Sequence, residues 1–310
     1  MRKKLLILVI PFALALTLVC AWHFHFFPFK NPYARIPVQF TTTQIPCVEV
    51  EIEGQKYFLE IDLGVNCDVC LHKTVLEKIP QKKFVGKTHW VDIKGNEYES
   101  DKYVISKIQM GKVQIKTPPV EEEDPKFSHN SNIWNPPKTS EYITSGRIGS
   151  KMAQKSHLLM DFNNSVFFLI RNRECLKKLS REGYSIAKLF EIPFYSTKGL
   201  IIFSVDTDAG KKRFLLDTGA STTVVKPTSV TEEELQEIHK RPTFMTTSKF
   251  VIGDHDFGQM DLLFCNFSDK FEDIDGFLGM DFCKKHVIYL DFKEHKAFIG
   301  PADKVHPISK

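Results

Sequence analysis

The feature that most constrains the fold is an internal repeat that aligns without a gap. Residues 145–170 match residues 275–300, and the identities are Gly146, Gly149, Asp161, Phe162 and Phe168 with Gly276, Gly279, Asp291, Phe292 and Phe298. One such identity could arise by chance, but a set of them in a single register indicates a duplicated structural unit. The sequence therefore predicts two lobes of similar build.

A second repeat precedes the first in each half of the chain. Residues 47–69 and 200–225 each contain an alternating apolar segment, a turn with glycine and a second alternating segment. This pattern predicts two strands joined by a tight turn. Both units end in the same kind of tripeptide, Asp62-Leu63-Gly64 in the first and Asp217-Thr218-Gly219 in the second.

The rest of the chain consists mainly of short alternating segments separated by Gly, Asn, Asp and Pro, which predicts an all-β body. Thr-x-x-Glu patterns predict short capped helices over 74–77 and 231–234, and residues 174–190 have a helical pattern that stops at Gly183. We therefore expect an all-β, bilobal and pseudo-twofold fold. Its predicted parts are a first lobe over 36–170, a helical connector over 171–192 and a second lobe over 193–301.

The N-terminus is typical of a targeting segment. Arg2, Lys3 and Lys4 precede an apolar stretch that continues towards Phe29. Residues 1–29 are therefore predicted to be either a signal peptide or a membrane anchor, and the sequence favours neither prediction over the other. In either case the cationic start stays in the cytoplasm and the body of the protein is exported.

Composition excludes several classes of protein. A hydrophobic content of 42% and a charged content of 26% argue against a disordered chain and against a protein with many membrane spans. The net charge is only +4, with 42 Lys and Arg against 38 Asp and Glu. Since no strongly basic segment stands out, we expect no nucleic-acid partner.

The cysteines do not predict a metal or redox centre. Seven are spread along the chain without a regular framework. The Cys67-Asp-Val-Cys70 spacing lacks a thioredoxin-like helix start, so small residues of a strand are the favoured reading. Cys283-Lys-Lys-His286 has the spacing of zinc ligands but no second pair of ligands, and no metal or cofactor is expected.

The segment Leu215-Leu-Asp-Thr-Gly-Ala-Ser221 resembles the active-site loop of retropepsin-like and pepsin-like aspartic proteases. Ile148-Gly149 and Leu278-Gly279 are similar to the hydrophobic-glycine element that supports each such loop in this family. The resemblance covers roughly residues 36 to 300 and is specific because motif, spacing and duplication agree. It implies an aspartic endopeptidase that acts as a single chain on a peptide or protein. Its catalytic residues would be Asp62 and Asp217, one from each lobe, with a water activated between them.

The resemblance also implies which residues support the two loops. The expected supporting residues are Gly64, Asn66, Thr218, Gly219 and Ser221, with Thr218 forming hydrogen bonds across the interface. Leu63 departs from the family pattern because it stands where Thr or Ser is usual and has no hydroxyl group. A membrane-tethered pseudoprotease that binds peptides but cleaves them weakly or not at all is therefore the alternative function.

A hairpin is predicted over 87–98, where residues 94–96 provide the turn. Its position resembles the flap of the family, and Trp90 and Tyr98 are its candidate substrate-covering residues, although plain packing is an equally good reading of an aromatic residue in a strand. The acidic residues 121–124 and the Asn- and Pro-rich residues 128–138 are interpreted as a solvated loop.

Overall fold

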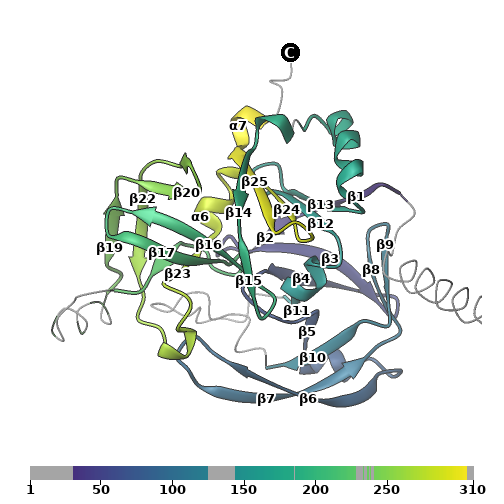
Figure 1. Cartoon of the computed structure of the whole chain (residues 1–310). Coiled ribbons are helices and arrows are strands. Elements are labelled where there is room, and N and C mark those ends of the chain that lie inside the picture. The colour runs from purple at the N-terminus through teal and green to yellow at the C-terminus, as the bar shows by residue number, and fades with distance from the viewer. Residues whose placement is uncertain are drawn as a thin grey trace, which may run out of the picture.

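The computed structural model describes residues 31–124, 144–184, 186–227 and 241–305, together with positions 233, 236 and 238. These residues form mainly strands, arranged in three sheets (Figure 1). Within these ranges no helix is long and apolar enough to cross a membrane. The predicted leader over 1–29, the stretch 128–138 and most of the predicted helix over 231–234 lie outside the described residues, so the predictions for them stay predictions.

A six-stranded sheet joins the two halves of the chain. Its strand order is β1-β13-β12-β24-β25-β14. The strands are β1 (Tyr33–Pro37), β12 (His157–Asp161), β13 (Val166–Ile170), β14 (Phe190–Pro193), β24 (His286–Asp291) and β25 (Lys296–Pro301). The antiparallel pair β12–β24 lies at its centre, with Leu158 opposite Leu290 and Met160 opposite Ile288. Each half therefore contributes a hairpin and one edge strand, which is the arrangement that a pseudo-twofold axis requires.

The first lobe is built on a second sheet, with the order β6-β7-β10-β5-β11-β4-β3-β8-β9 and β2 paired with β3. Its strands are β2 (Gln39–Phe40), β3 (Pro46–Ile52), β4 (Gln55–Asp62), β5 (Val69–His72), β6 (Lys83–Val91), β7 (Glu97–Val104), β8 (Lys107–Met110), β9 (Val113–Lys116), β10 (Pro119–Glu123) and β11 (Gly146–Gly149). Strand β11 runs parallel to β4 and antiparallel to β5, so it lies between them. This places the end of β11 beside the end of β4.

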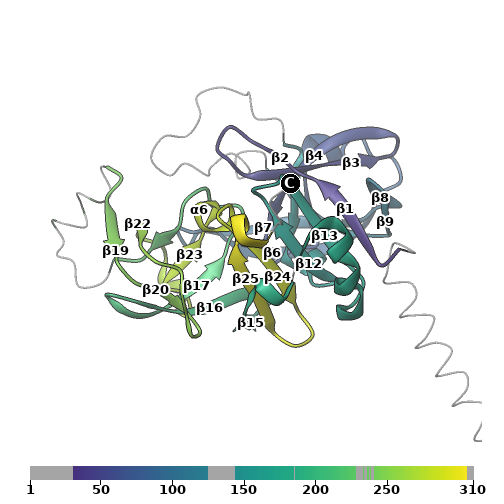
Figure 2. The ribbon, with the colours of Figure 1, turned by 90° about the horizontal axis from the view of Figure 1, so that it is seen from above.

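The second lobe repeats this plan with a third sheet, in the order β19-β22-β18-β23-β17-β16-β20-β21 and with β15 paired with β16. Its strands are β15 (Tyr195–Thr197), β16 (Leu200–Thr207), β17 (Gly210–Leu216), β18 (Val224–Val225), β19 (Phe244–Thr247), β20 (Phe250–Ile252), β21 (His255–Asp256), β22 (Met260–Phe264) and β23 (Gly276–Leu278). Strand β23 lies between β17 and β18, as β11 lies between β4 and β5. Figure 2 shows the second lobe to one side of the first, with the six-stranded sheet between them.

The structure confirms the register of the predicted repeats. The ungapped repeat contains β11, helix α4 (Ser150–Ala153), β12 and β13 in the first half, and β23, helix α6 (Met280–Cys283), β24 and β25 in the second. The other repeat forms the hairpins β3–β4 and β16–β17. Apolar side chains of these elements from both lobes belong to one buried cluster, so the lobes share a core.

Two local expectations were wrong, the Thr74 cap and the acidic loop. The first short helix, α2 (Lys73–Leu76), begins directly after β5, so Thr74 lies inside the helix and does not cap it. The predicted helical connector is present as two 3₁₀ segments, η1 (Arg173–Glu182) and η2 (Ile186–Lys188), and its last predicted residues belong to strand β14. The predicted stop is confirmed, because Gly183 follows η1 with a left-handed φ of 89°.

The acidic stretch 121–124 was wrongly expected to be a solvated loop. Residues 119–123 form β10, which pairs with β5 and β7 inside the first sheet. The side chain of Glu123 is buried, with 7% of the residue exposed. Charge density alone misled the prediction, because Glu123 has a buried cationic partner that comes from β11.

Candidate active site

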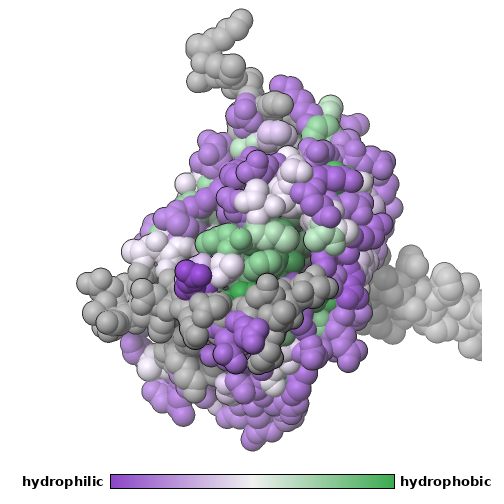
Figure 3. Space-filling view, turned by 90° about the vertical axis from the view of Figure 1, so that its left-hand side faces the viewer, coloured by the Kyte–Doolittle hydropathy of each residue, from purple (hydrophilic) through white to green (hydrophobic). Residues whose placement is uncertain are grey.

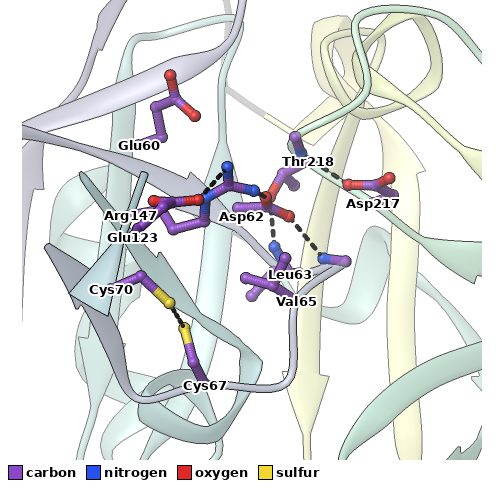
Figure 4. Close-up of polar contacts among 12 residues, drawn as sticks. Glu60, Asp62, Leu63, Val65, Cys67, Cys70, Glu123, Arg147, Asp217 and Thr218 are labelled. Carbon is purple, nitrogen blue, oxygen red and sulfur yellow. Dashed lines mark hydrogen bonds and ion pairs between the residues drawn. The ribbon is translucent and has the colours of Figure 1, made fainter. Parts of the chain in front are cut away.

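Asp62 and Asp217 lie at equivalent ends of the hairpins of the two lobes (Figure 4). Asp62 is the last residue of β4, and Asp217 follows the last residue of β17. The two carboxyl groups are close enough for the charge of Asp62 to raise the pKa of Asp217. The fold therefore brings together two residues that are separated by half the chain.

Each glycine of the two tripeptides packs against the aspartate of the opposite lobe. A Cβ atom on Gly64 would lie 2.4 Å from Oδ1 of Asp217, and one on Gly219 would lie 2.6 Å from Cγ of Asp62. Both distances are too short for any side chain. In addition, the N–H of Gly64 donates to Asp62 Oδ1 and the N–H of Gly219 donates to Asp217 Oδ1, each at 2.9 Å. Glycine at these positions thus permits the close approach of the two loops.

The Thr218 hydroxyl links the two loops across the lobe interface, as expected. It donates to the carbonyl of Ile61 at 2.6 Å and accepts from the N–H of Leu63 at 3.0 Å. Leu63 occupies the matching position in the first loop, and its side chain is fully buried in the shared core. Its side chain cannot return these hydrogen bonds, so the network is one-sided.

Thr218→Val is expected to lower the free energy of unfolding by about 2 kcal/mol, because it removes one hydroxyl and leaves a buried N–H and a buried C=O without that partner. Chemical denaturation measures this loss. The matched control is Thr246→Val, because that threonine is exposed. Equal stability changes in the two variants would contradict the cross-lobe role of Thr218.

A buried charged cluster lies beside Asp62 in the first lobe. Arg147 on β11 donates from Nη1 to Asp62 Oδ2 at 2.8 Å. The same guanidinium contacts Glu123 of β10 twice, through Nη2 at 2.5 Å and through Nε at 3.2 Å. Glu60 of β4 is also buried nearby and accepts a hydrogen bond from Thr144 at 2.9 Å. Asp62 thus has a cationic donor on one carboxylate oxygen and a backbone donor on the other.

The surroundings make the two aspartates electrostatically different. Burial, followed by the negative charge of Asp62, raises the pKa of Asp217 well above its ordinary value. Burial also raises the pKa of Glu60 to about 7, although Arg147 and the Thr144 hydroxyl oppose the rise. A protonated Asp217 beside a carboxylate is the state in which a carboxyl pair can work as an acid and a base together.

Glu60→Gln is expected to stabilise the protein above pH 7. A carboxyl whose pKa is higher in the folded chain than in the unfolded chain loses stability as pH rises from about 4.5 to about 7. Gln avoids this loss, which amounts to up to about 3 kcal/mol for a shift of that size. Urea denaturation at pH 4 and pH 8 should show a gain for the variant at pH 8 only. A gain of the same size at both pH values would contradict the raised pKa.

The structure does not place every predicted supporting residue against the carboxyl groups. The side-chain oxygen of Asn66 lies beside Gly199 and has no hydrogen-bond partner. Ser221 is half-buried in the bend after the second loop.

Cys67 and Cys70 lie close together after the first loop, with their sulfur atoms 2.8 Å apart as free thiols. Among the described residues no group of side chains is arranged to hold a metal ion.

The predicted hairpin over 87–98 is confirmed as β6–β7, with a turn over 92–96. Trp90 and Tyr98 are half-buried and stack on one face of it, with ring centroids 4.4 Å apart. The Trp90 indole donates to Ser100 at 2.9 Å, and the Tyr98 hydroxyl donates to Asp92 at 3.1 Å. The two aromatic side chains are therefore held in fixed positions by their own hairpin.

The tip of this hairpin contacts the second lobe. The N–H of Ser268 donates to the carbonyl of Ile93 at 2.9 Å, and Lys270 binds both the carbonyl of Gly95 at 3.0 Å and the carboxylate of Glu97 at 2.5 Å. Ile93 also packs against a buried apolar cluster of the second lobe. The hairpin therefore spans the two lobes, as Figure 1 shows at the lower edge of the molecule.

The second lobe carries an apolar surface. Figure 3 looks at the side on which β19 and β22 lie and shows an apolar strip surrounded by hydrophilic residues. Phe244 of β19 is 54% exposed.

Arg147, Glu60 and Glu123 were missed by the sequence reasoning, although the repeats contain the signal. In the ungapped alignment Arg147 stands where the second lobe has Phe277, and in the other repeat Glu60 stands where it has Leu215. A charge at a position that is apolar in the duplicate is a reason to expect a special environment. The aligned glycines and hydrophobic residues predict the strands but give no information on these two charged positions.

Comparison with known proteins supports the fold. The crystal structure of aspartic proteinase from Irpex lacteus is similar, with a TM-score of 0.54, and the alignment covers 87% of this chain and 97% of that chain. The chain has the aspartic proteinase fold. Sequence identity to that structure is 11%, so the likeness rests on architecture. No protein-family model matches the chain, and no curated protein matches it either.

Proposed function

We propose that the protein is an aspartic endopeptidase that uses Asp62 and Asp217 to hydrolyse peptide bonds. The observation that carries this proposal is the pair of carboxyl groups at equivalent strand ends of two duplicated lobes, each packed against the loop glycine of the opposite lobe. Two adjacent carboxyl groups favour a state with one shared proton, which supplies a base and an acid at one place. The similarity to an aspartic proteinase supports the same reaction class.

The reaction needs one water and one proton on the pair. The carboxylate takes a proton from the water while the water oxygen forms a bond to the scissile carbonyl carbon, and the protonated carboxyl gives its proton to the carbonyl oxygen. The resulting diol collapses when the first carboxyl gives its proton to the amide nitrogen, the second carboxylate takes a proton from one diol hydroxyl, and the C–N bond breaks. The pair then regains a single proton, and each atom of the water is accounted for in the products.

The hairpin β6–β7 is the proposed cover for the substrate. A peptide that lies between this hairpin and the two aspartates would meet the stacked face of Trp90 and Tyr98. Because the hairpin tip contacts Ser268 and Lys270, these contacts have to open before an extended chain can enter. An unfolded or flexible segment of a protein is therefore the proposed class of substrate.

The experiment that tests this function is incubation of the purified chain, from about residue 30, with a diverse peptide mixture between pH 3 and pH 8. Mass spectrometry should detect new termini, and a peptide analogue with a hydroxyl group in place of the scissile carbonyl should block their appearance. If no new termini appear at any pH while the protein remains folded, the endopeptidase proposal is wrong.

A second candidate function is peptide binding without turnover, and Leu63 is the observation that favours it. Its buried side chain leaves the hydroxyl network between the loops one-sided. A pseudoprotease of this kind would bind the hydroxyl-containing analogue and peptides of the mixture, yet would release the peptides intact. Isothermal titration together with mass spectrometry separates the two functions.

We also propose that the enzyme acts outside the cytoplasm, anchored or exported by residues 1–29. This proposal rests on the cationic start and the apolar stretch of the sequence.

A further inference from the structure

We propose that Arg147 is a positioning residue that holds Asp62 as the proton-accepting carboxylate and so leaves Asp217 as the proton donor. This inference rests on the proposed function, because it assigns roles within the same pair of carboxyl groups. It goes further in one respect, since it predicts that the two aspartates are not interchangeable even though the fold is duplicated.

The geometry of Arg147 carries the inference. Its guanidinium donates to Asp62 Oδ2 at 2.8 Å, while the N–H of Gly64 donates to Oδ1 at 2.9 Å. Both oxygens of Asp62 therefore accept hydrogen bonds. An ionised carboxylate can accept both bonds, whereas a protonated carboxyl would lose one of them because its O–H oxygen carries the proton. Asp62 is 4% exposed, so water cannot replace these donors easily.

The duplicated lobe provides an internal comparison. Phe277 in β23 occupies the place of Arg147, and Leu215 in β17 occupies the place of Glu60. Both are buried and apolar. The donor to Asp217 that corresponds to Gly64 is present, the N–H of Gly219 at 2.9 Å, but the cationic donor has no equivalent among the residues described there. The cation therefore removes the equivalence of the two carboxyl groups.

Glu123 partly neutralises the positive charge of Arg147. The guanidinium contacts Glu123 at 2.5 and 3.2 Å in addition to Asp62 at 2.8 Å. An uncompensated cation would make Asp62 a poor proton acceptor, whereas a cation that already forms an ion pair mainly orients the carboxylate. Arg147 and Glu123 thus act together: the first fixes Asp62, and the second preserves its basicity.

The charged and titratable groups that face this site come from every neighbouring element. They are Glu60 on β4, Cys70 on β5, Glu123 on β10, Arg147 on β11 and Asp217 in the second lobe, with Cys283 of α6 near Asp217. The pKa values of both thiols are raised well above their ordinary range, Cys70 first through its contact with Cys67 and Cys283 through burial. Both thiols are therefore neutral, and the charge near Asp62 is set by Arg147 and the carboxyl groups.

The test compares two variants whose effects on pH dependence have opposite signs. Glu123→Gln leaves the cation uncompensated, so both limbs of the profile of kcat/KM against pH should move down by about one unit. The double variant Arg147→Met with Glu123→Gln removes the ion pair as a whole, so both limbs should move up by about one unit. The second substitution is included because Arg147→Met alone would leave buried carboxylates without a partner.

Conservative and distant variants provide the controls. Arg147→Lys keeps the positive charge but loses the planar guanidinium with its several N–H donors. Its profile of kcat/KM against pH should therefore keep the wild-type limbs, at a lower maximum rate. Arg213→Met removes an arginine that also pairs with two carboxylates, Asp273 and Asp275, but on the surface of the second lobe, and it should shift neither limb. If Glu123→Gln and the double variant shift in the same direction, or do not shift, the proposed role of Arg147 is overturned. If the double variant does not fold, the direction of the Glu123→Gln shift decides alone.

A direct measurement separates this inference from the proposed function. Carboxyl ¹³C signals of labelled aspartate, assigned with Asp62→Asn and Asp217→Asn, report the protonation of each residue without any substrate. An ionised Asp62 beside a protonated Asp217 near pH 5 supports the inference even if no peptide is cleaved. The reverse assignment would overturn it even if peptides are cleaved.

Discussion

Replacing Asp217 with Asn is expected to lower kcat for peptide hydrolysis by at least about a thousandfold, because the pair then lacks the carboxyl group that gives its proton to the carbonyl oxygen. Substrate binding should change much less, since Asn keeps the shape of the side chain. Kinetics on a peptide found in the initial digestion would measure both quantities. Asp254→Asn is the matched control, because this aspartate is exposed and lies on the outer part of the second lobe.

The same variant is expected to be more stable than the wild type at neutral pH. Burial and the charge of Asp62 raise the pKa of Asp217 in the folded chain. Such a group contributes stability below its unfolded pKa, and this contribution is lost as pH rises through the folded value. Asn does not titrate, so Asp217→Asn should raise the melting temperature at pH 7 but not at pH 3. A variant that is inactive and also less stable at pH 7 would indicate misfolding and would not support a catalytic role.

Gly219→Ala is expected to lower kcat by at least about a hundredfold, because the added methyl group would displace the carboxyl group of Asp62. Its Cβ would lie 2.6 Å from Cγ and 2.7 Å from both oxygens of Asp62. The carboxylate cannot move aside without breaking its contacts with Arg147 and Gly64. Steady-state kinetics together with denaturation would show a loss of rate that exceeds the loss of stability.

Gly258→Ala is the control for this glycine. A Cβ there would have no neighbouring atom within 4 Å, although the φ of +82° is strained for alanine. This variant should lose about 1 kcal/mol of stability and keep its activity. If Gly219→Ala were as active as Gly258→Ala, the close approach of the second loop to Asp62 would be wrong.

The duplication made most of the fold predictable. Gly149 and Gly279 align in the sequence. In the structure Gly149 ends β11 and Gly279 directly follows β23, and each of these strands lies between two others of its lobe. The spacing from strand pair to Asp-x-Gly was equally informative, because alternation and turns are local properties of the chain. Where tertiary contacts decide, local patterns failed: Thr74 looks like a helix cap but lies within α2, and residues 121–123 look like a loop but form part of β10.

The candidate site was predictable only in part for a related reason. Asp62, Asp217 and the adjacent glycines follow from the motif, and the Thr218 hydrogen bonds follow from the position of that residue in it. Arg147 reaches Asp62 from a strand that is separated from it by 85 positions in sequence. Its role depends on a buried ion pair with Glu123, which no local pattern reports.

The Arg147 contact also bears on the pH dependence of the activity. Val65 and Ala220 follow the two active-site glycines and carry no hydroxyl group, so they cannot donate to the carboxyl pair. In the structure Arg147 of β11 donates a hydrogen bond to Asp62. The pKa of Asp217 is raised mainly by burial. We therefore expect activity towards neutral pH, because the alkaline limb of the profile reports the proton of Asp217, whose pKa is raised.

The central claim is that one aspartate from each lobe of a single chain performs the hydrolysis. The most direct test compares the wild type with Asp62→Asn on the same peptide, at equal concentrations of folded protein. The account predicts cleavage by the wild type and none above background by Asp62→Asn, although Asp217 is intact. Equal cleavage by both proteins would contradict it and would instead favour a site made from Asp217 of two chains.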